Sequence, residues 1–204
     1  PLDECDPDKS GACTINAEGG RCPPLDENIT LIVPSGAVDT DTTFSFTDTG
    51  SGYEIETILG EAQSVMGIQL ESGAESFGAP VTIIFTWDDV NNDGYVEIDG
   101  VQTFIRETAL MVLKDDAIIT SRCSSNTCNC LTPPGQCVDG GCRCSLADNY
   151  FEIDVTSFSN FVLIAPVDTD GDGVPDNFDE LEDNCPHVSN PDQKDPDEDG
   201  AGDE

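Results

Sequence analysis

The chain has 204 residues, of which 37% are hydrophobic, enough for one domain with a single core and a smaller appendage. It carries 42 Asp plus Glu against 7 Lys plus Arg, so its formal net charge is −35 at pH 7. Such a surface repels a phosphate backbone or an anionic membrane, which argues against nucleic-acid binding and leaves metal cations and basic surfaces as partners. No apolar run has the length of a transmembrane helix, so no transmembrane segment is predicted.

The ten cysteines indicate the redox compartment. They are clustered among Gly, Pro, Ser and Asn, and the chain has a single histidine, His187, so disulfides are favoured over zinc. We therefore expect an extracellular protein, secreted or on the cell surface, and a mature or trimmed product without a signal peptide. The first segment, 1–27, holds Cys5, Cys13 and Cys22 among turn-forming residues without a periodic pattern.

Residues 28–166 predict a β domain. Short runs rich in β-branched and aromatic residues recur between turn residues, and no convincing amphipathic helix is present. In chain order the runs are ITLIV, TFSFT, VMGIQL, VTIIFTW, TALMVL, AIIT, YFEIDV and NFVLIAP. The predicted fold class is all-β, an antiparallel β-sandwich with a disulfide-rich insertion and a C-terminal irregular tail braced by calcium.

The stretch WDDVNNDGYVEIDG, 87–100, lies between two of these runs and is a candidate calcium loop. Its oxygen-bearing residues follow the first nine positions of an EF-hand loop, with Gly94 at the turn. The twelfth position is Gly100, where a Glu is required, and no helix flanks the loop, so a calcium loop at the edge of the sandwich or a plain acidic turn is expected instead. The candidate ligands are Asp89, Asn91, Asp93 and Glu97.

The segment 123–144 predicts a disulfide-rich insertion in a hairpin near the end of the sandwich. Its two halves repeat the spacing C-x4-C-x-C, and six cysteines in so short a segment favour three local disulfides, with a four-cysteine zinc site as the alternative. The sequence does not give the pairing. The six are Cys123, Cys128, Cys130, Cys137, Cys142 and Cys144.

Four cysteines are then left, three near the N-terminus and Cys185 in the tail. Because three is odd, either one N-terminal cysteine pairs with Cys185 or both pair outside the chain. The second alternative predicts a disulfide to a neighbouring copy, in a chain of subunits.

The tail, 167–204, repeats the pattern D-x-D-x-D-G-x-x-D. Alternate Asp residues direct several oxygens to one point and the Gly permits a sharp turn, which suits Ca²⁺ with its six to eight oxygen ligands. The tail has almost no apolar residues to bury, so a solvated disordered segment is the alternative. The two copies comprise Asp168, Asp170, Asp172 and Asp176, then Asp195, Asp197, Asp199 and Asp203.

The tail resembles thrombospondin type 3 repeats over 168–204. DTDGDGVPDNFD, DNCP and NPDQKDPDEDGAGD carry the resemblance, which implies an irregular chain built around several bound calcium ions. An ELED insertion departs from the pattern: it either bulges out or replaces Asp179 by Asp183 as a ligand. The family also places a Cys just after GxGD, where this sequence has Glu204.

The β region, about 29–166, is similar to extracellular β-sandwiches of the netrin-receptor and ankyrin type found in bacterial surface proteins. LIVPSGAV, GIQLESGAESFGAPVTIIF and FEIDVTSFSNFVLIAP carry this resemblance. Relatives can cleave themselves at an HFS tripeptide, which corresponds here to Ser157, Phe158 and Ser159. Ser157 stands in place of the histidine base, so the activated nucleophile is missing and no enzyme is predicted.

Asn28 begins an N-glycosylation acceptor triplet. Taken together, the sequence predicts a calcium-binding structural or adhesive protein, a module or subunit of a surface fibre, appendage or matrix, with other copies of itself or matrix proteins as partners, through Cys185 in one version. The rival is a module that recognises carbohydrate or a basic protein, with the tail as a linker. An exposed aromatic cluster favours the rival, and Trp87, Tyr95 and Phe104 are the candidates for it.

Overall fold

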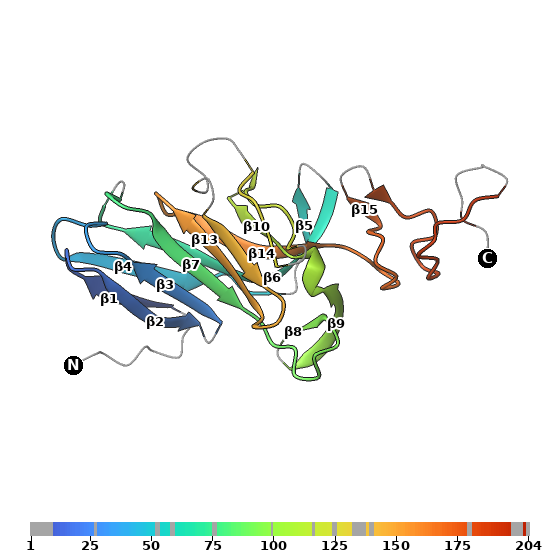
Figure 1. Ribbon diagram of the computed structural model, residues 1–204, viewed down its shortest axis with the longest axis horizontal. Coiled ribbons are helices and arrows are strands. Elements are labelled where there is room, and N and C mark those ends of the chain that lie inside the picture. Colours follow the sequence, from blue (N-terminus) through green and yellow to red (C-terminus); the bar gives the residue numbers. More distant parts are fainter. Residues whose placement is uncertain are drawn as a thin grey trace.

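A computed structural model describes the fold of most of the chain. It comprises two facing antiparallel sheets, a separate hairpin, and a tail that leaves on the side away from β1 and β2 (Figure 1). Within the described residues the one helical element is the 3-10 turn η1 (Glu107–Ala109). The described residues are 10–26, 28–51, 54–57, 60–74, 77–98, 100–115, 117–123, 126–131, 138, 141–178, 181–196 and 202.

The larger sheet has the strand order β1-β4-β6-β14-β10-β11, and β5, β15 and β16 attach at one end of β6. The smaller sheet has the order β12-β13-β7-β3-β2. The larger sheet consists of β1 (Ser10–Ile15), β4 (Thr42–Asp48), β5 (Glu54–Thr57), β6 (Gly60–Ser72), β10 (Met111–Lys114), β11 (Ala117–Ile118), β14 (Asn160–Pro166), β15 (Asn177–Phe178) and β16 (Leu181–Glu182). The smaller sheet consists of β2 (Gly20–Asp26), β3 (Ile29–Val33), β7 (Val81–Thr86), β12 (Cys142–Ser145) and β13 (Tyr150–Val155).

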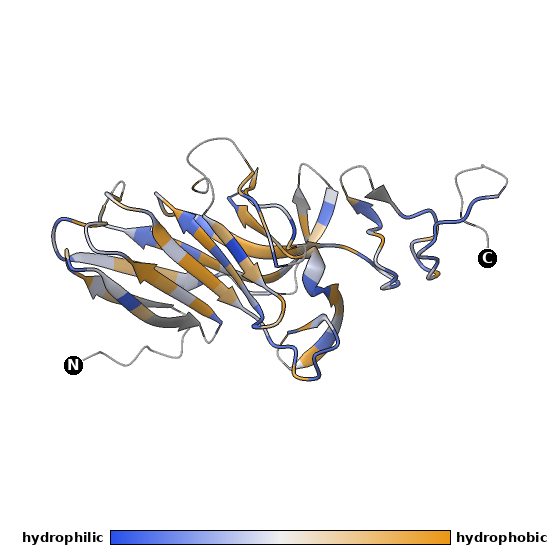
Figure 2. Cartoon of the chain, viewed as in Figure 1, coloured by the Kyte–Doolittle hydropathy of each residue, from blue (hydrophilic) through white to orange (hydrophobic). Residues whose placement is uncertain are grey.

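The core lies between the two sheets, as the predicted alternation requires. In β7 and β13 every second residue is buried, and the pairs Ile83–Ile153 and Phe85–Phe151 face the larger sheet together. Figure 2 shows the hydrophobic residues along the strands, whereas the tail is mostly hydrophilic. The prediction of an all-β antiparallel sandwich is therefore confirmed.

Disulfides close the sandwich along both open sides. Cys13–Cys22 joins the edge strands β1 and β2, one from each sheet. On the other side, the segment after the edge strand β11 is bonded to the edge strand β12 of the opposite sheet. Its bonds are Cys123–Cys144 and Cys128–Cys142, and Cys130 is also disulfide-bonded, whereas Cys137 lies outside the described residues.

These pairings correct the expected position of the insertion. β11 and β12 belong to different sheets, so the segment crosses between the sheets and does not extend a hairpin. All its described cysteines are oxidised, so the zinc alternative is wrong for them.

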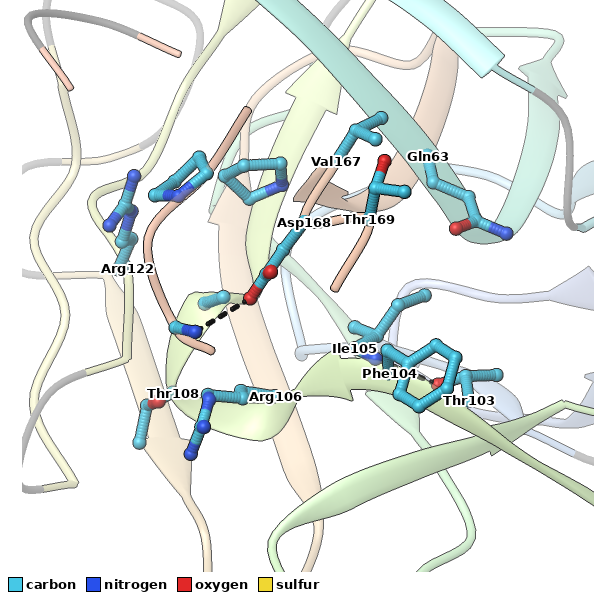
Figure 3. Close-up of a pocket in the computed structure, with 14 residues that line it drawn as sticks. Gln63, Thr103, Phe104, Ile105, Arg106, Thr108, Arg122, Val167, Asp168 and Thr169 are labelled. Atoms are coloured by element: carbon cyan, nitrogen blue, oxygen red, sulfur yellow. Dashed lines mark hydrogen bonds between the residues drawn. The ribbon is translucent and has the colours of Figure 1, made fainter. Parts of the chain in front are cut away.

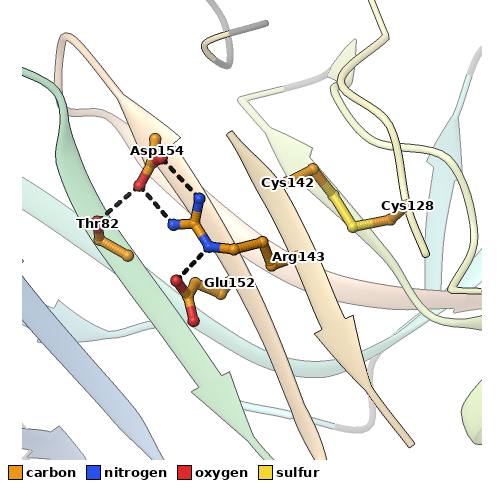
Figure 4. Close-up of polar contacts among 6 residues, drawn as sticks. All are labelled: Thr82, Cys128, Cys142, Arg143, Glu152 and Asp154. Atoms are coloured by element: carbon orange, nitrogen blue, oxygen red, sulfur yellow. Dashed lines mark hydrogen bonds and ion pairs between the residues drawn. A yellow bond between two sulfur atoms is a disulfide. The ribbon is translucent and has the colours of Figure 1, made fainter. Parts of the chain in front are cut away.

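A polar cluster crosses the outer face of the smaller sheet (Figure 4). Arg143 in β12 donates to both carboxylate oxygens of Asp154 at 3.0 and 2.9 Å and also pairs with Glu152. Thr82 in β7 donates to the same Asp154 at 2.6 Å. The cluster therefore ties the short edge strand β12 to its neighbours and leaves a charged edge that disfavours pairing with another chain.

The hairpin of β8 (Tyr95–Ile98) and β9 (Val101–Arg106) projects from the sandwich after the acidic loop that follows β7 (Figure 1). Val96 and Ile105 belong to the main core, so the base of the hairpin is fixed. Phe104 is 67% exposed on the other face. The hairpin thus has one anchored face and one open face.

An apolar side chain of the tail docks in the core of the sandwich. Phe178 in β15 is 1% exposed and belongs to a second core cluster with Ala62, Leu113 and Ile164. The backbone of Phe178 pairs with Gly60 at the start of β6. The composition of the tail did not predict such an anchor, because the relevant apolar surface belongs to the sandwich.

We expect Gly60→Ala to destabilise this junction. Gly60 has a φ of +129°, and a Cβ there would overlap the carbonyl oxygen of Asn177 and lie 3.1 Å from the Cα of Phe178. Gly36→Ala is the matched control, because Gly36 has a φ of +78° with no atom within 4 Å. We expect the control to lose about 1 kcal/mol of unfolding free energy and Gly60→Ala about 1–3 kcal/mol more, measured by denaturant unfolding. Equal losses in the two variants would contradict the proposed docking.

Candidate metal centre

The first acidic repeat forms a loop that wraps around its own carboxylates. Asp168 accepts backbone hydrogen bonds from Gly171 at 2.8 Å and Gly173 at 2.9 Å, one on each carboxylate oxygen. Both glycines have positive φ, +75° and +97°, so the left-handed turns that close the loop require them. Asp170 accepts a further bond from the amide of Asp172 at 3.1 Å. The repeat therefore positions alternate Asp residues by their own backbone.

Three carboxylates converge in this loop. Asp168, Asp170 and Asp172 each offer an oxygen within 4.8 Å of the others, and Asp172 is 9% exposed. Oδ2 of Asp170 is buried and has no hydrogen-bond donor among the described residues. Burial raises the pKa of Asp168, and the neighbouring carboxylates raise it further, although bonds from Gly173 and Gly171 oppose the shift. A cation is the group that would satisfy these oxygens.

Asp176, the fourth predicted ligand of this repeat, has another role in the structure. Its carboxylate accepts the backbone amide of Thr169 at 2.8 Å and also the Thr169 hydroxyl. It therefore closes the base of the loop, and it is not one of the three converging carboxylates.

Asp183 is brought back to this loop by the ELED insertion. β15 and β16 pair as a short hairpin, after which the amide of Asp183 donates to the carbonyls of Pro175 at 3.2 Å and Asp176 at 3.3 Å. Asp183 is 3% exposed, and its Oδ1 accepts the amide of Cys185 at 2.8 Å and Gln193 Nε2 at 2.9 Å. Its Oδ2 is buried without a donor among the described residues. Asp183 is not one of the three converging carboxylates, so its role as a ligand in place of Asp179 stays a prediction. Asp179 lies outside the described residues.

Three amide side chains that the sequence analysis did not single out hold the tail together. Gln193 donates to Asn190, and Asn190 Nδ2 donates to Asn184 Oδ1 at 2.7 Å. The backbone amide of Asn190 donates to Oδ2 of Asp172 at 2.8 Å, which connects this network to the first repeat. Asn184, Asn190 and Gln193 fall within the stretches DNCP and NPDQKDPDEDGAGD that carry the resemblance, but no spacing rule marks their amides as partners of the acids.

The second repeat is described only at 195, 196 and 202. Asp195 lies within the described residues and has a polar or ionic partner. Asp197, Asp199 and Asp203 lie outside them, so their role as ligands stays a prediction.

The loop after β7 shares most of the hydrogen-bond pattern of the first tail repeat, although Oδ1 of Asp89 accepts the amide of Asp93, four residues on, whereas Asp168 accepts that of Gly171, three residues on. Asp89 accepts the amide of Gly94 at 3.0 Å, as Asp168 accepts that of Gly173 five residues on. Asp93 accepts the amide of Tyr95 at 3.1 Å, two residues on, and Asn91 accepts that of Asp93 at 3.2 Å. Gly94 has a φ of +84°. Two segments far apart in sequence therefore form closely similar acidic loops.

The loop after β7 differs in its oxygens. Asn91 Nδ2 and Gln102 Nε2 both donate to Asp93 Oδ2, which engages that oxygen. Glu97 lies within β8, and its amide donates to the carbonyl of Asp88 at 2.8 Å. Among the described residues, three close carboxylates occur in the tail repeat and not here. This loop resembles a cation loop in its backbone and offers fewer free carboxylate oxygens.

The three candidate aromatic residues do not form an exposed cluster. Trp87 is 3% exposed in the core, and its indole donates to Glu107. Tyr95 lies beneath the guanidinium of Arg106, which is 5.1 Å from the ring centre. Phe104 alone of the three is strongly exposed.

A cavity of about 350 Å³ lies beside the tail repeat (Figure 3). It separates β9 and η1 from the segment that leaves β14, and Asp168 forms part of its wall. Other lining residues are Gln63, Phe104, Arg106, Thr108 and Arg122. Two of the chain's few basic residues thus line one cavity.

The turn at the Ser157–Ser159 tripeptide has charged partners that the sequence analysis missed. Lys114 donates to Oγ of Ser157 at 2.9 Å and to its carbonyl at 3.3 Å, and Ser159 donates to Asp115. Lys114 is 6% exposed, and burial lowers its pKa, although the Asp115 charge opposes the shift. These partners are distant in sequence, 43 and 44 residues from the turn, so the tripeptide alone did not indicate them.

Cys185 has a free thiol, whose Sγ donates to the carbonyl of Gly202 at 3.1 Å. Because Cys13 pairs with Cys22, the alternative in which Cys185 pairs with an N-terminal cysteine of its own chain is not formed. Cys5 lies outside the described residues. A bond from Cys185 to another chain stays a prediction, as does glycosylation at Asn28, which lies partly exposed just before β3.

No family model matches the chain, and no curated protein is significantly similar to it in sequence. The described residues include no helix long and apolar enough to cross a membrane. The two family resemblances therefore stay predictions.

Glu107 gives a pH-dependent test of the hairpin base. Burial raises its pKa above the ordinary 4.5; the bond from Trp87 opposes this, and the charges of Asp89 and Asp93 add to it. Because the folded-state pKa is raised, ionisation costs stability as the pH rises through the interval between the unfolded and folded values. Gln at this position still accepts the Trp87 bond.

We therefore expect Glu107→Gln to raise the thermal midpoint relative to the wild type at about pH 7 and to change it little at about pH 4. The measurement is thermal unfolding in chelator, followed by circular dichroism. The exposed Glu61→Gln controls for the loss of one charge. Equal shifts for both variants at both pH values would contradict the buried-acid interpretation.

Proposed function

We propose that the chain is an extracellular calcium-binding structural or adhesive module, in which bound calcium holds the acidic tail in a defined shape on a disulfide-closed sandwich. The observation that carries the proposal is the convergence of Asp168, Asp170 and Asp172 around a buried carboxylate oxygen that lacks a donor. Without a cation these charges repel one another at close range. A divalent cation would replace that repulsion by attraction.

The donor chemistry favours calcium among the common cations. The converging atoms are carboxylate oxygens on a loop closed by Gly171 and Gly173, without histidine or thiolate in the group. Such a hard and flexible oxygen set suits Ca²⁺, whereas Mg²⁺ demands a tighter octahedron and Zn²⁺ prefers nitrogen and sulfur. Asp168, Asp170 and Asp172 would supply the side-chain oxygens, and the bound ion would supply the positive charge that the loop lacks.

The structural role rests on three features. The disulfides support an oxidising, extracellular compartment. The tail, anchored at Phe178, offers little apolar surface for ligand binding. The free thiol of Cys185 offers a covalent link to another copy or to a matrix protein. These features fit a subunit or spacer of a fibre, appendage or matrix.

Calcium should stabilise the protein through the tail repeat. We expect excess Ca²⁺ to raise the thermal midpoint, with a gain of about 2.7 kcal/mol at a concentration 100-fold above the Kd. Asp170→Asn should remove most of the gain that comes from this loop. Asp192→Asn is the matched control, because it removes one exposed tail charge that pairs with Lys194. Isothermal titration calorimetry measures both variants; unchanged calcium binding in Asp170→Asn would refute the assignment.

Assembly is tested by light scattering and electron microscopy in millimolar Ca²⁺ and in chelator. We expect ordered or rigid particles that soften in chelator, and covalent oligomers on non-reducing gels that disappear in Cys185→Ser. A compact monomer under all conditions would exclude the fibre role and leave calcium binding untouched.

The ligand-recognition alternative has one supporting feature. Phe104 is exposed at a cavity that also presents Arg106 and Arg122, an arrangement of apolar and polar groups found in ligand sites. The absence of an aromatic cluster among Trp87, Tyr95 and Phe104 weighs against it. Binding of glycans by the intact protein, lost in Phe104→Ala, would favour this alternative.

A further inference from the structure

The β8–β9 hairpin connects the two acidic loops. Tyr95 directly follows the first loop and is paired in register with Arg106 at the end of β9. The guanidinium of Arg106 lies 5.1 Å from the centre of the Tyr95 ring, and its Nη2 donates to the carbonyl of Gly171 in the tail repeat at 3.1 Å. One side chain therefore contacts both loops.

The tail repeat packs its glycines directly on β9. A Cβ on Gly171 would lie 3.1 Å from Cδ1 of Phe104, and a Cβ on Gly173 would lie 3.1 Å from Nε of Arg106. On the other side, the amide of Glu107 donates to the carbonyl of Gly94 in the first loop at 3.0 Å. The end of β9 thus contacts the turn-forming glycines of both loops, so the shape of each loop depends on the same short segment.

Arg106 donates to a backbone carbonyl of the tail repeat and leaves the carboxylates of both loops free to bind a cation. It contacts a carbonyl and an aromatic ring, and it forms no ion pair with a carboxylate among the described residues. Its Nε is buried without a hydrogen-bond acceptor. The chain has 42 acids and 7 bases, yet this arginine lies at two acidic loops and pairs with neither. It therefore positions the loops, and their negative charge stays available to another cation.

We propose that Arg106 couples the two loops, so that a cation bound in one raises the affinity of the other. The proposal rests on the calcium function proposed above. A cation in the first loop fixes the positions of Gly94 and Tyr95. Because the Arg106 guanidinium lies on the Tyr95 ring, Arg106 is then fixed as well. Arg106 in turn holds the Gly171 carbonyl in the position that the tail repeat needs. The second ion then binds a loop that is already ordered, so its binding costs less conformational entropy. By thermodynamic linkage, each ion raises the affinity of the other loop by the same factor. The two ions together would fix the tail against the hairpin.

The test uses Tb³⁺ as the probe, because luminescence excited through Trp87 reports on the first loop. Trp87 is the only tryptophan and stands two residues before Asp89. The tail repeat is disabled by Asp168→Asn with Asp170→Asn. We expect this double variant to weaken Tb³⁺ binding at the first loop by about 5–10-fold. Calorimetry with Ca²⁺ checks the reverse effect, with the first loop disabled by Asp89→Asn and Asp93→Asn.

Arg106→Met should abolish this effect of one loop on the other while both loops still bind. The matched control is Arg143→Met, which removes an arginine on the smaller sheet and should leave the coupling intact. Tyr95→Leu keeps Arg106 and removes the ring beneath it, so it should reduce the coupling and serves if Arg106→Met does not fold. Circular dichroism verifies folding of each variant.

The outcomes separate the two proposals. If neither loop binds Tb³⁺ or Ca²⁺, the proposed calcium function fails. If both bind with affinities that do not depend on the other loop, or if the dependence persists in Arg106→Met, the coupling is refuted and calcium binding stands.

Discussion

Repulsion among carboxylates is the constraint on which this structure depends. With a net charge of −35, ion pairs cannot compensate the acids, since bases are too few. The acidic loops use backbone amides instead: Asp168 and Asp89 each accept amides from the turns that follow them. These bonds order the loops and neutralise little charge. The negative charge of the carboxylates is therefore left uncompensated, and such a charge favours strong binding of a divalent cation.

The scarcity of bases gives each described one a defined place. Arg143 ties an edge strand to its neighbours, and Lys114 holds the turn at Ser157. Arg122 lies 5.7 Å from the ring of Phe178, the residue that anchors the tail, and Arg106 lies between the acidic loops. These four cations thus lie where separate parts of the fold meet, whereas Lys194 pairs with its exposed tail neighbour Asp192.

The sequence predicted what depends on local pattern. The period of two in the strands gave the sandwich, and the spacing of Asp and Gly gave a loop in which Asp168, Asp170 and Asp172 converge. It did not predict what depends on contacts between distant segments. Docking of Phe178 on Gly60, the contact of Arg106 with Gly171 and the pairing of the cysteines all require the two sheets to be placed first. Spacing also does not reveal that the Asp176 carboxylate turns toward Thr169, and its role as a ligand stays a prediction.

The disulfides also determine how the molecule responds to a pulling force. While Cys13–Cys22 and Cys123–Cys144 are intact, the residues enclosed by each bond add nothing to the extension of a stretched chain. The load bypasses those loops, and at the tail end it enters the sandwich through β14, which pairs with β6. In a reducing environment both enclosed segments would lengthen under load, so the same molecule would change from a short, stiff element to an extensible one.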